Sequence, residues 1–305
     1  MNAYRGVSVD IDTATLAAPA TSSRLAAYLE LTKPRVNLLV VLTAAAGFYM
    51  GSGGRVELLL LLHTLFGTAL VAGGSAALNQ YMERDLDGRM RRTWGRPLPS
   101  GRLTPAEALV FGVGLVSVGS VYLLLLVNGM TSLLGLATSF LYLLIYTPLK
   151  TRTSYCTAVG SIPGALPPLM GWAGAAGTLD LNALGLFLIL LLWQFPHFLA
   201  ISWAYRRDYQ KGGFSMLSGA DPDGRRTAVR IIIYSLVLFG ASLLPASSGL
   251  TGDVYLAGAI TLGVGLLWLG FRAAWVRSIS AARKLSLGTI VYLPVLLILM
   301  VLNKM

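Results

Sequence analysis

The sequence predicts an all-α protein that crosses a membrane nine times, and three observations support this fold class. The first is composition: hydrophobic residues make up 55% of the 305 residues and charged residues only 12%, with a mean hydropathy of +0.68. A soluble domain of this length is rarely so apolar. The other two are the number of long apolar segments and the distribution of basic residues between them.

Crossing the hydrocarbon core of a bilayer requires about 20 mostly apolar residues. The fifth candidate segment is interrupted by Pro163, Pro167 and Pro168. Membrane helices tolerate such breaks where neighbouring protein or a cavity satisfies the hydrogen bonds of the freed backbone groups, so we expect this segment to line a pocket. The second and sixth segments run in the same direction, as two four-helix repeats followed by a ninth helix would place them. The nine candidates are residues 36–54, 58–80, 108–127, 131–148, 155–173, 182–204, 231–247, 254–271 and 285–303.

The basic residues predict the orientation of the chain. With the N-terminus inside, the inner segments carry 22 of the 24 Lys and Arg residues, and only Arg55 and Lys304 lie outside. Short cytoplasmic loops are enriched in Lys and Arg, so the N-terminus and these loops are expected to face the cytoplasm. The net charge of +11 therefore needs no nucleic acid, because anionic membrane lipid accounts for it.

Residues 1–35 are polar or small and include Asp10 and Asp12. They resemble neither a cleavable secretory signal nor a mitochondrial presequence. We expect them to form a largely disordered cytoplasmic tail, followed by one membrane domain over residues 36–305. The single cysteine, Cys156, excludes an intramolecular disulfide.

Charge concentrates between Leu78 and Arg102, where three acidic residues and six arginines follow an apolar run. If the second helix continues past its apolar part, Asn79, Glu83 and Asp87 lie on one face at a spacing of four residues. Oxygen ligands without His or Cys suit Mg²⁺, and arginines match phosphate oxygens. The stretch therefore predicts a metal–diphosphate site, with a solvated helix end carrying intrahelical charge pairs as the alternative.

Further charged residues follow the sixth and fourth segments at the same predicted membrane face. Asp208 follows the sixth segment, next to Arg206 and Arg207, while Lys150 and Arg152 follow the fourth. Two acidic patches on separate helix ends favour a binding site over a charged loop that only sets topology.

Four ordered blocks carry a resemblance to a known family. They are LTKPRVN (31–37), NQYMERDLDGRMRRTWGRPLPSG (79–101), YTPLKTRT with GSIPGALPPLMGW (146–172), and WQFPHF with YRRDYQKGGFSML (193–217). Together they closely resemble the protoheme IX farnesyltransferases, the haem O synthase branch of the UbiA-type intramembrane prenyltransferases.

The resemblance implies a nine-helix UbiA-type bundle whose cavity opens toward the cytoplasm, in the inner membrane of a bacterial cell. It implies Mg²⁺-dependent transfer of a farnesyl group from farnesyl diphosphate to a vinyl group of haem b. The products would be haem O, a precursor of haem A for terminal oxidases, and diphosphate. The implied partners are the two substrates and membrane lipid, and a downstream haem-modifying oxygenase is a candidate partner.

The resemblance also implies roles for individual residues. The sequence departs from the wider superfamily at three positions. The superfamily typically has Asp where this chain has Gln80 and Glu83, and usually a carboxylate where it has Ala204. The implied Mg²⁺ ligands and catalytic residues are Asn79, Glu83, Asp87 and Asp208; the diphosphate ligands are Arg92, Arg96, Lys150 and Arg152; and the haem-binding residues are Trp193, His197 and Arg206.

Two other functions remain as alternatives. A UbiA-type aromatic prenyltransferase of quinone biosynthesis would share the acidic motifs, but the block around His197 and the departures at Glu83 and Ala204 favour haem. A secondary transporter for an anionic solute would usually place its binding site near the membrane midplane, whereas the charge here lies at one membrane face.

Overall fold

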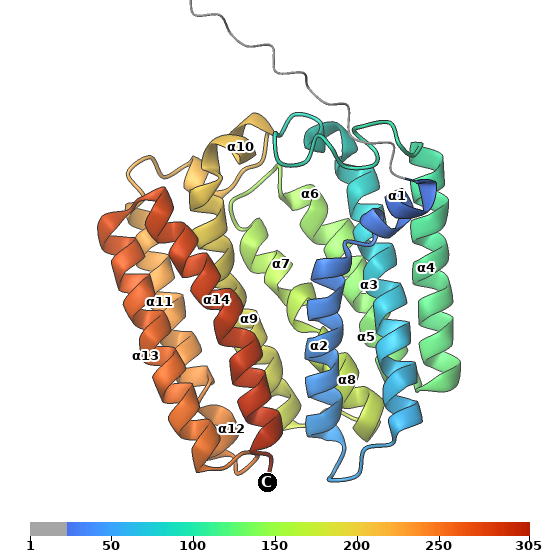
Figure 1. The fold of residues 1–305 in the computed structure, drawn as a ribbon, viewed down its shortest axis with the longest axis vertical. Coiled ribbons are helices and arrows are strands. Elements are labelled where there is room, and N and C mark those ends of the chain that lie inside the picture. Colours follow the sequence, from blue (N-terminus) through green and yellow to red (C-terminus); the bar gives the residue numbers. More distant parts are fainter. Residues whose placement is uncertain (1–22) are drawn as a thin grey trace, which may run out of the picture.

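The computed structural model describes residues 23–305, which form helices packed side by side (Figure 1). The first half contains α1 (Arg24–Leu31), α2 (Pro34–Gly51), α3 (Leu58–Asp87), α4 (Pro105–Leu126), α5 (Gly129–Phe140), η1 (Leu141–Tyr146), α6 (Thr147–Leu149), α7 (Cys156–Ala165) and α8 (Pro167–Ala176). The second half contains α9 (Leu181–Ala204), α10 (Arg206–Lys211), η2 (Leu217–Gly219), α11 (Arg225–Ala241), α12 (Leu244–Ser247), α13 (Asp253–Val276) and α14 (Ile279–Leu302). The all-α prediction is confirmed, since the only extended pairing within residues 23–305 is an isolated bridge between Thr251 and Lys304.

These helices make a multi-pass membrane protein. Eight helical segments of the described residues are long and apolar enough to cross a bilayer. The predicted fifth span is not among these eight, because it is divided into α7 and α8, each ten residues long. The break falls at Leu166, because Pro167 and Pro168 begin a new helix; prolines are tolerated in a first turn, where the N–H groups have no partner within the helix.

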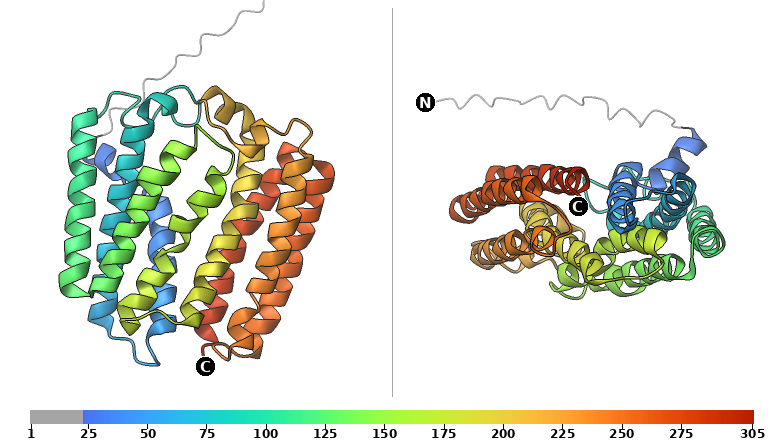
Figure 2. Two further views of the ribbon diagram at one scale, coloured as in Figure 1. Left: turned by 180° about the vertical axis from the view of Figure 1, so that it is seen from behind. Right: turned by 90° about the horizontal axis from the view of Figure 1, so that it is seen from below.

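The spans form two groups that lie side by side (Figure 2). In one group α9, α11, α13 and α14 pack together, around a core that includes Leu186, Ile189, Tyr255 and Leu296. In the other group α3 packs on α4, and α8 packs along α2. The divided segment contacts both groups, since α7 packs on α9 and α8 packs along α2.

The segments predicted to be inside gather at one end of the molecule. Figure 1 shows α1, α6 and α10 at the upper end, and the C-terminus at the opposite end. The loop of residues 88–104 and the segment of residues 150–155 lie at the same end as α10 (Figure 1). We call this the basic end, because it carries most of the Lys and Arg residues.

The expected N-terminal tail extends over residues 1–35, and its first 22 residues lie outside the described residues. From Ser23 onward the chain is part of the packed structure. The Ser23 hydroxyl accepts a hydrogen bond from the backbone N–H of Ala26 and so caps α1. Ala27 and Leu31 of α1 are buried in a small core with residues of α3 and α4. Helix α1 therefore fixes the chain directly before the first membrane span.

Close contact between α2 and α8 depends on glycine. A Cβ atom added to Gly171 would lie only 1.8 Å from the carbonyl oxygen of Ala44, and one added to Gly47 only 2.0 Å from that of Pro168. Small residues let membrane helices approach this closely. The contact holds α8, and with it the broken span, against the helix that follows Lys33.

We expect Gly171→Ala to destabilise the protein, because the new methyl group would push α8 away from α2. Overpacking of this kind costs about 1–3 kcal/mol, which chemical unfolding in detergent micelles would detect. Gly185→Ala in α9 is the matched control, since no atom lies within 4 Å of the added methyl group. Equal stability of the two variants would contradict the close packing.

Candidate active site

Helix α3 continues past its apolar part as far as Asp87 and carries three polar side chains on one face. Asn79, Glu83 and Asp87 are spaced by four residues and are 1%, 5% and 1% exposed. All three line a cavity of about 100 Å³ at the basic end. Asp85 lies on another face, with 78% of its side chain exposed. The end of α3 therefore presents oxygen atoms to one small cavity, as the sequence predicted.

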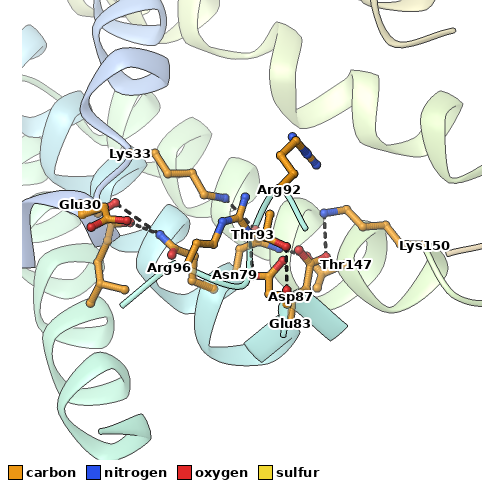
Figure 3. A network of polar contacts seen from close by, with 12 residues as sticks. Glu30, Lys33, Asn79, Glu83, Asp87, Arg92, Thr93, Arg96, Thr147 and Lys150 are labelled. Atoms are coloured by element: carbon orange, nitrogen blue, oxygen red, sulfur yellow. Dashed lines mark hydrogen bonds and ion pairs between the residues drawn. The ribbon is translucent and has the colours of Figure 1, made fainter. Parts of the chain in front are cut away.

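Three cationic side chains meet these oxygens from other parts of the chain (Figure 3). Lys150 Nζ lies 2.7 Å from Glu83 Oε1, and Arg96 donates a 2.6 Å hydrogen bond to Asp87 Oδ2. Lys33 Nζ donates to Asn79 Oδ1 over 3.0 Å. Removing one partner from a buried ion pair is strongly destabilising, so these contacts hold three segments against α3.

Lys33 is a site residue that the charge pattern did not single out. Its backbone is left-handed (φ 49°), a conformation that non-glycine residues adopt at a cost and that concentrates at functional sites. Pro34 follows as the first residue of α2. Burial of the amine, followed by the charges of Arg96 and Lys150, lowers the pKa of Lys33 to about 7. The only signal in the sequence was its place in the block LTKPRVN.

Lys150 is held in its charged form by its neighbours. Burial opposes the charge, but Glu83 outweighs it, so the pKa of Lys150 is raised. The ammonium group also lies 4.5 Å from the centre of the Tyr146 ring, a cation–π contact. Lys150, which we expected to bind a diphosphate, lines the same cavity as Glu83.

A π-helical turn, η1, shapes the opposite wall of this cavity. Turns of this type frequently occur at functional sites. The Thr147 hydroxyl donates to the Tyr142 carbonyl and accepts from Asn79 Nδ2, which ties the turn to α3. Tyr142 and Tyr146 stack with ring centres 5.7 Å apart. The remaining lining residues are Met90, Arg92, Tyr209, Phe214 and Met216.

Asp208 and Arg152, both predicted to join this site, lie elsewhere. Asp208 lines a second, larger cavity beside the first, and Arg92 lines both. Tyr205 interrupts the helix between α9 and α10, which sets Asp208 apart from the face of α3. Arg152 is exposed and does not line the smaller cavity. The structure thus joins Arg92, Arg96 and Lys150 to the carboxylates of α3, but not Asp208 or Arg152.

Within the described residues no three His, Cys, Asp or Glu side chains form a metal-binding group. The oxygen donors of α3 nevertheless suit a divalent cation bound together with a phosphate ligand, since Mg²⁺ uses only one or two carboxylates in such sites. Glu83 Oε1 and Asp87 Oδ2 accept from Lys150 and Arg96.

Trp193 and His197 form a separate cluster between α9 and α14. Their rings stack with centres 4.8 Å apart, and the Trp193 indole donates to the Thr289 carbonyl. His197 Nδ1 lies 2.7 Å from the Thr289 hydroxyl, which itself donates to the Ser286 carbonyl. That hydroxyl has one proton, so His197 Nδ1 is the donor whenever the hydroxyl donates to Ser286. In neutral His197 the other nitrogen, Nε2, then carries the lone pair that can bind a metal.

Comparison with known proteins identifies the class. The UbiA prenyltransferase family matches residues 40–293, and the chain belongs to this family. It is therefore a membrane prenyltransferase. The chain is 46% identical to the protoheme IX farnesyltransferase of Solibacter usitatus (strain Ellin6076), over 91% of this chain and 98% of that protein.

Solved structures share the fold. One described for digeranylgeranylglyceryl phosphate synthase has a TM-score of 0.77 and 19% sequence identity, and covers 92% of this chain and 99% of that chain. A UbiA homologue from Archaeoglobus fulgidus bound to GPP and Mg²⁺ has a TM-score of 0.65 at 15% identity, covering 89% of this chain and 99% of that chain. These similarities confirm the predicted UbiA-type architecture.

The buried pair of Glu83 and Lys150 gives a test of the site's electrostatics. Lys150→Met would leave Glu83 as an uncompensated buried carboxylate, and we expect a loss of about 3 kcal/mol in the free energy of unfolding. Adding Glu83→Gln should recover most of this loss, because it removes the unpaired charge. Prenyl transfer should stay low in both variants. Wild-type stability of the single variant, measured by chemical unfolding, would contradict a buried pair.

Proposed function

We propose that the protein transfers a farnesyl group from farnesyl diphosphate to a vinyl group of haem b, giving haem O and diphosphate. The observation that carries the prenyl-diphosphate half of this proposal is the buried face of Asn79, Glu83 and Asp87, met by Lys33, Arg96 and Lys150. The haem half is supported by the protoheme IX farnesyltransferase that is 46% identical to this chain.

The diphosphate would lie against the smaller cavity. We assign it to Arg92, Arg96 and Lys150, with Arg152 nearby on the same segment as Lys150. These cations can neutralise the charge that develops on the diphosphate as its C–O bond breaks.

The metal ligands in this proposal are the oxygen atoms of Asn79, Glu83 and Asp87, with Asp208 beyond Arg92 as a further carboxylate. A solved UbiA homologue with GPP and Mg²⁺ supports the choice of metal. Bound Mg²⁺ would supply Lewis-acid stabilisation of the leaving diphosphate.

The aromatic wall has a role that follows from the chemistry. Breaking the C–O bond leaves an allylic cation, which water would convert to farnesol. Tyr142 and Tyr146 are close to the carboxylate face, and their rings can stabilise positive charge while excluding water. The vinyl group of haem supplies the electrons for the new C–C bond, which leaves a cation on the vinyl carbon next to the porphyrin ring. Addition of water to this carbon, with loss of a proton, gives the hydroxyl group of the product, so the mechanism requires no nucleophile from the protein.

The haem substrate is assigned to Trp193, His197 and Arg206. His197 Nε2 carries a lone pair when its Nδ1 donates to Thr289, which is the form of imidazole that binds haem iron. Trp193 stacks on this ring and restricts its rotation. Arg206 lies at the basic end, where a propionate would reach the membrane surface.

We further propose that the basic end faces the cytoplasm of a bacterial cell, with the enzyme in the inner membrane. Enrichment of Lys and Arg in the loops at this end supports that orientation. A downstream haem-modifying oxygenase remains the candidate partner for the product.

We expect purified protein in detergent to convert haem b, farnesyl diphosphate and Mg²⁺ into a heavier hydroxyfarnesyl haem, detected by mass spectrometry. Omitting Mg²⁺ should stop product formation, and restoring it should recover the rate. A parallel reaction with 4-hydroxybenzoate tests the aromatic alternative. Prenylation of 4-hydroxybenzoate without any haem product would reject haem as the acceptor.

Asp87→Ala should lower the rate of prenyl transfer at least about 100-fold, because it removes a proposed ligand of the Mg²⁺ that would stabilise the departing diphosphate. Haem binding, followed by absorption spectroscopy, should remain nearly unchanged. Asp85→Ala is the matched control on the same helix, since its side chain is exposed, and it should keep wild-type activity. Unchanged turnover in Asp87→Ala would remove Asp87 from the site.

A further inference from the structure

A second cavity, of about 450 Å³, lies beside the candidate active site at the basic end. This volume is within the range of small-molecule sites. Its walls come from the loop of residues 88–104, the end of α9, α10 and the start of α14. The lining residues are Arg91, Arg92, Ala204, Tyr205, Arg206, Arg207, Asp208 and Ile279.

The charge of this cavity is strongly positive. Four arginines face it against one carboxylate, that of Asp208. Among the described residues none of these four arginines forms an ion pair. Arg206 stacks on the Trp203 ring at 4.4 Å, which fixes the guanidinium at the rim. Guanidinium groups in this arrangement favour a ligand with more than one anionic oxygen group.

The cavity also has apolar walls that point to an amphipathic ligand. Ala204, Tyr205 and Ile279 line it together with the arginines. Ala204 follows His197 by seven residues, so both lie on nearly the same face of α9, about 10 Å apart along the helix axis. A ligand with its anionic groups at the arginines could thus extend its apolar body along α9 toward His197.

We propose that this cavity holds the two propionate groups of haem, with Arg206 and Arg207 as their main partners. The inference rests on the proposed function, because it assumes that haem is the acceptor. The propionates leave one edge of the porphyrin and the vinyl groups another. Anchoring the propionates at the membrane surface therefore turns a vinyl-bearing edge inward, while Arg92, shared by both cavities, keeps the haem next to the diphosphate.

The smaller cavity is a poorer site for the propionates. It already contains the carboxylates of Glu83 and Asp87, which repel anionic groups unless a metal ion lies between them. The larger cavity has only Asp208 opposed by four arginines. Separate positive sites would let the enzyme bind two anionic substrates without competition between them.

The test compares haem b with its dimethyl ester, whose propionates carry no charge. In Arg206→Gln and Arg207→Gln we expect the KM for haem b to rise about tenfold each, since one charge-assisted hydrogen bond is lost. The KM for farnesyl diphosphate should stay unchanged, which also shows that the variants fold. With the dimethyl ester, the same variants should match wild type. Arg225→Gln, an exposed arginine at the same end outside both cavities, is the control and should change none of these values.

An equal loss with haem b and with its ester would overturn the proposal, and so would a change confined to the KM for farnesyl diphosphate. An anionic lipid head group could occupy the cavity instead. In that case added phosphatidylglycerol would lower the affinity for haem b and for its ester equally, and this result would also overturn the proposal. Titration of haem and ester by absorption spectroscopy needs no turnover. Weaker binding of haem b, but not of its ester, in the variants would therefore support the propionate site. This holds even if the wild-type protein failed to prenylate haem, because that failure would reject only the proposed reaction.

Discussion

Glu83 and Asp87 place two buried carboxylates at the end of α3, and the surrounding structure depends on how their charge is compensated. An ionised carboxylate in a low-dielectric environment is costly without a cation and hydrogen bonds. The compensating groups, Arg96 and Lys150, come from segments far apart in the sequence. Assembly of the basic end therefore requires the loop of residues 88–104 and the end of α6 to close on the same face of α3.

The same charges can serve both stability and catalysis. In the structure the lysine and arginine side chains neutralise the carboxylates, and a metal–diphosphate ligand would replace one set of cation–anion contacts with another. Arg92 connects this site to the neighbouring cavity, where it lies over the rings of Tyr205 and Tyr209. If the proposed function holds, two adjoining cavities lined by cationic side chains would give each of two anionic substrates a separate place.

Much of the fold could be predicted because its signals are local. Apolar length predicts a span, and alternating charge predicts which ends lie together. The face of α3 was predictable for the same reason, since a spacing of four residues holds on any continuing helix. Asp208 and Arg152 were harder to place. Their positions depend on the helix break at Tyr205 and on the segment after α6, where no periodicity applies.

The sequence by itself determined the membrane architecture, the family and the row of oxygen atoms on α3, because each depends on composition or on spacing within one element. Only the tertiary structure decided which cations meet those oxygens, and that the acidic motifs border two cavities. It also revealed Lys33, whose left-handed backbone turns the amine toward Asn79. Such contacts join residues that are distant in the chain. They therefore depend on how the helices pack and on the electrostatic cost of burying a charge without a partner.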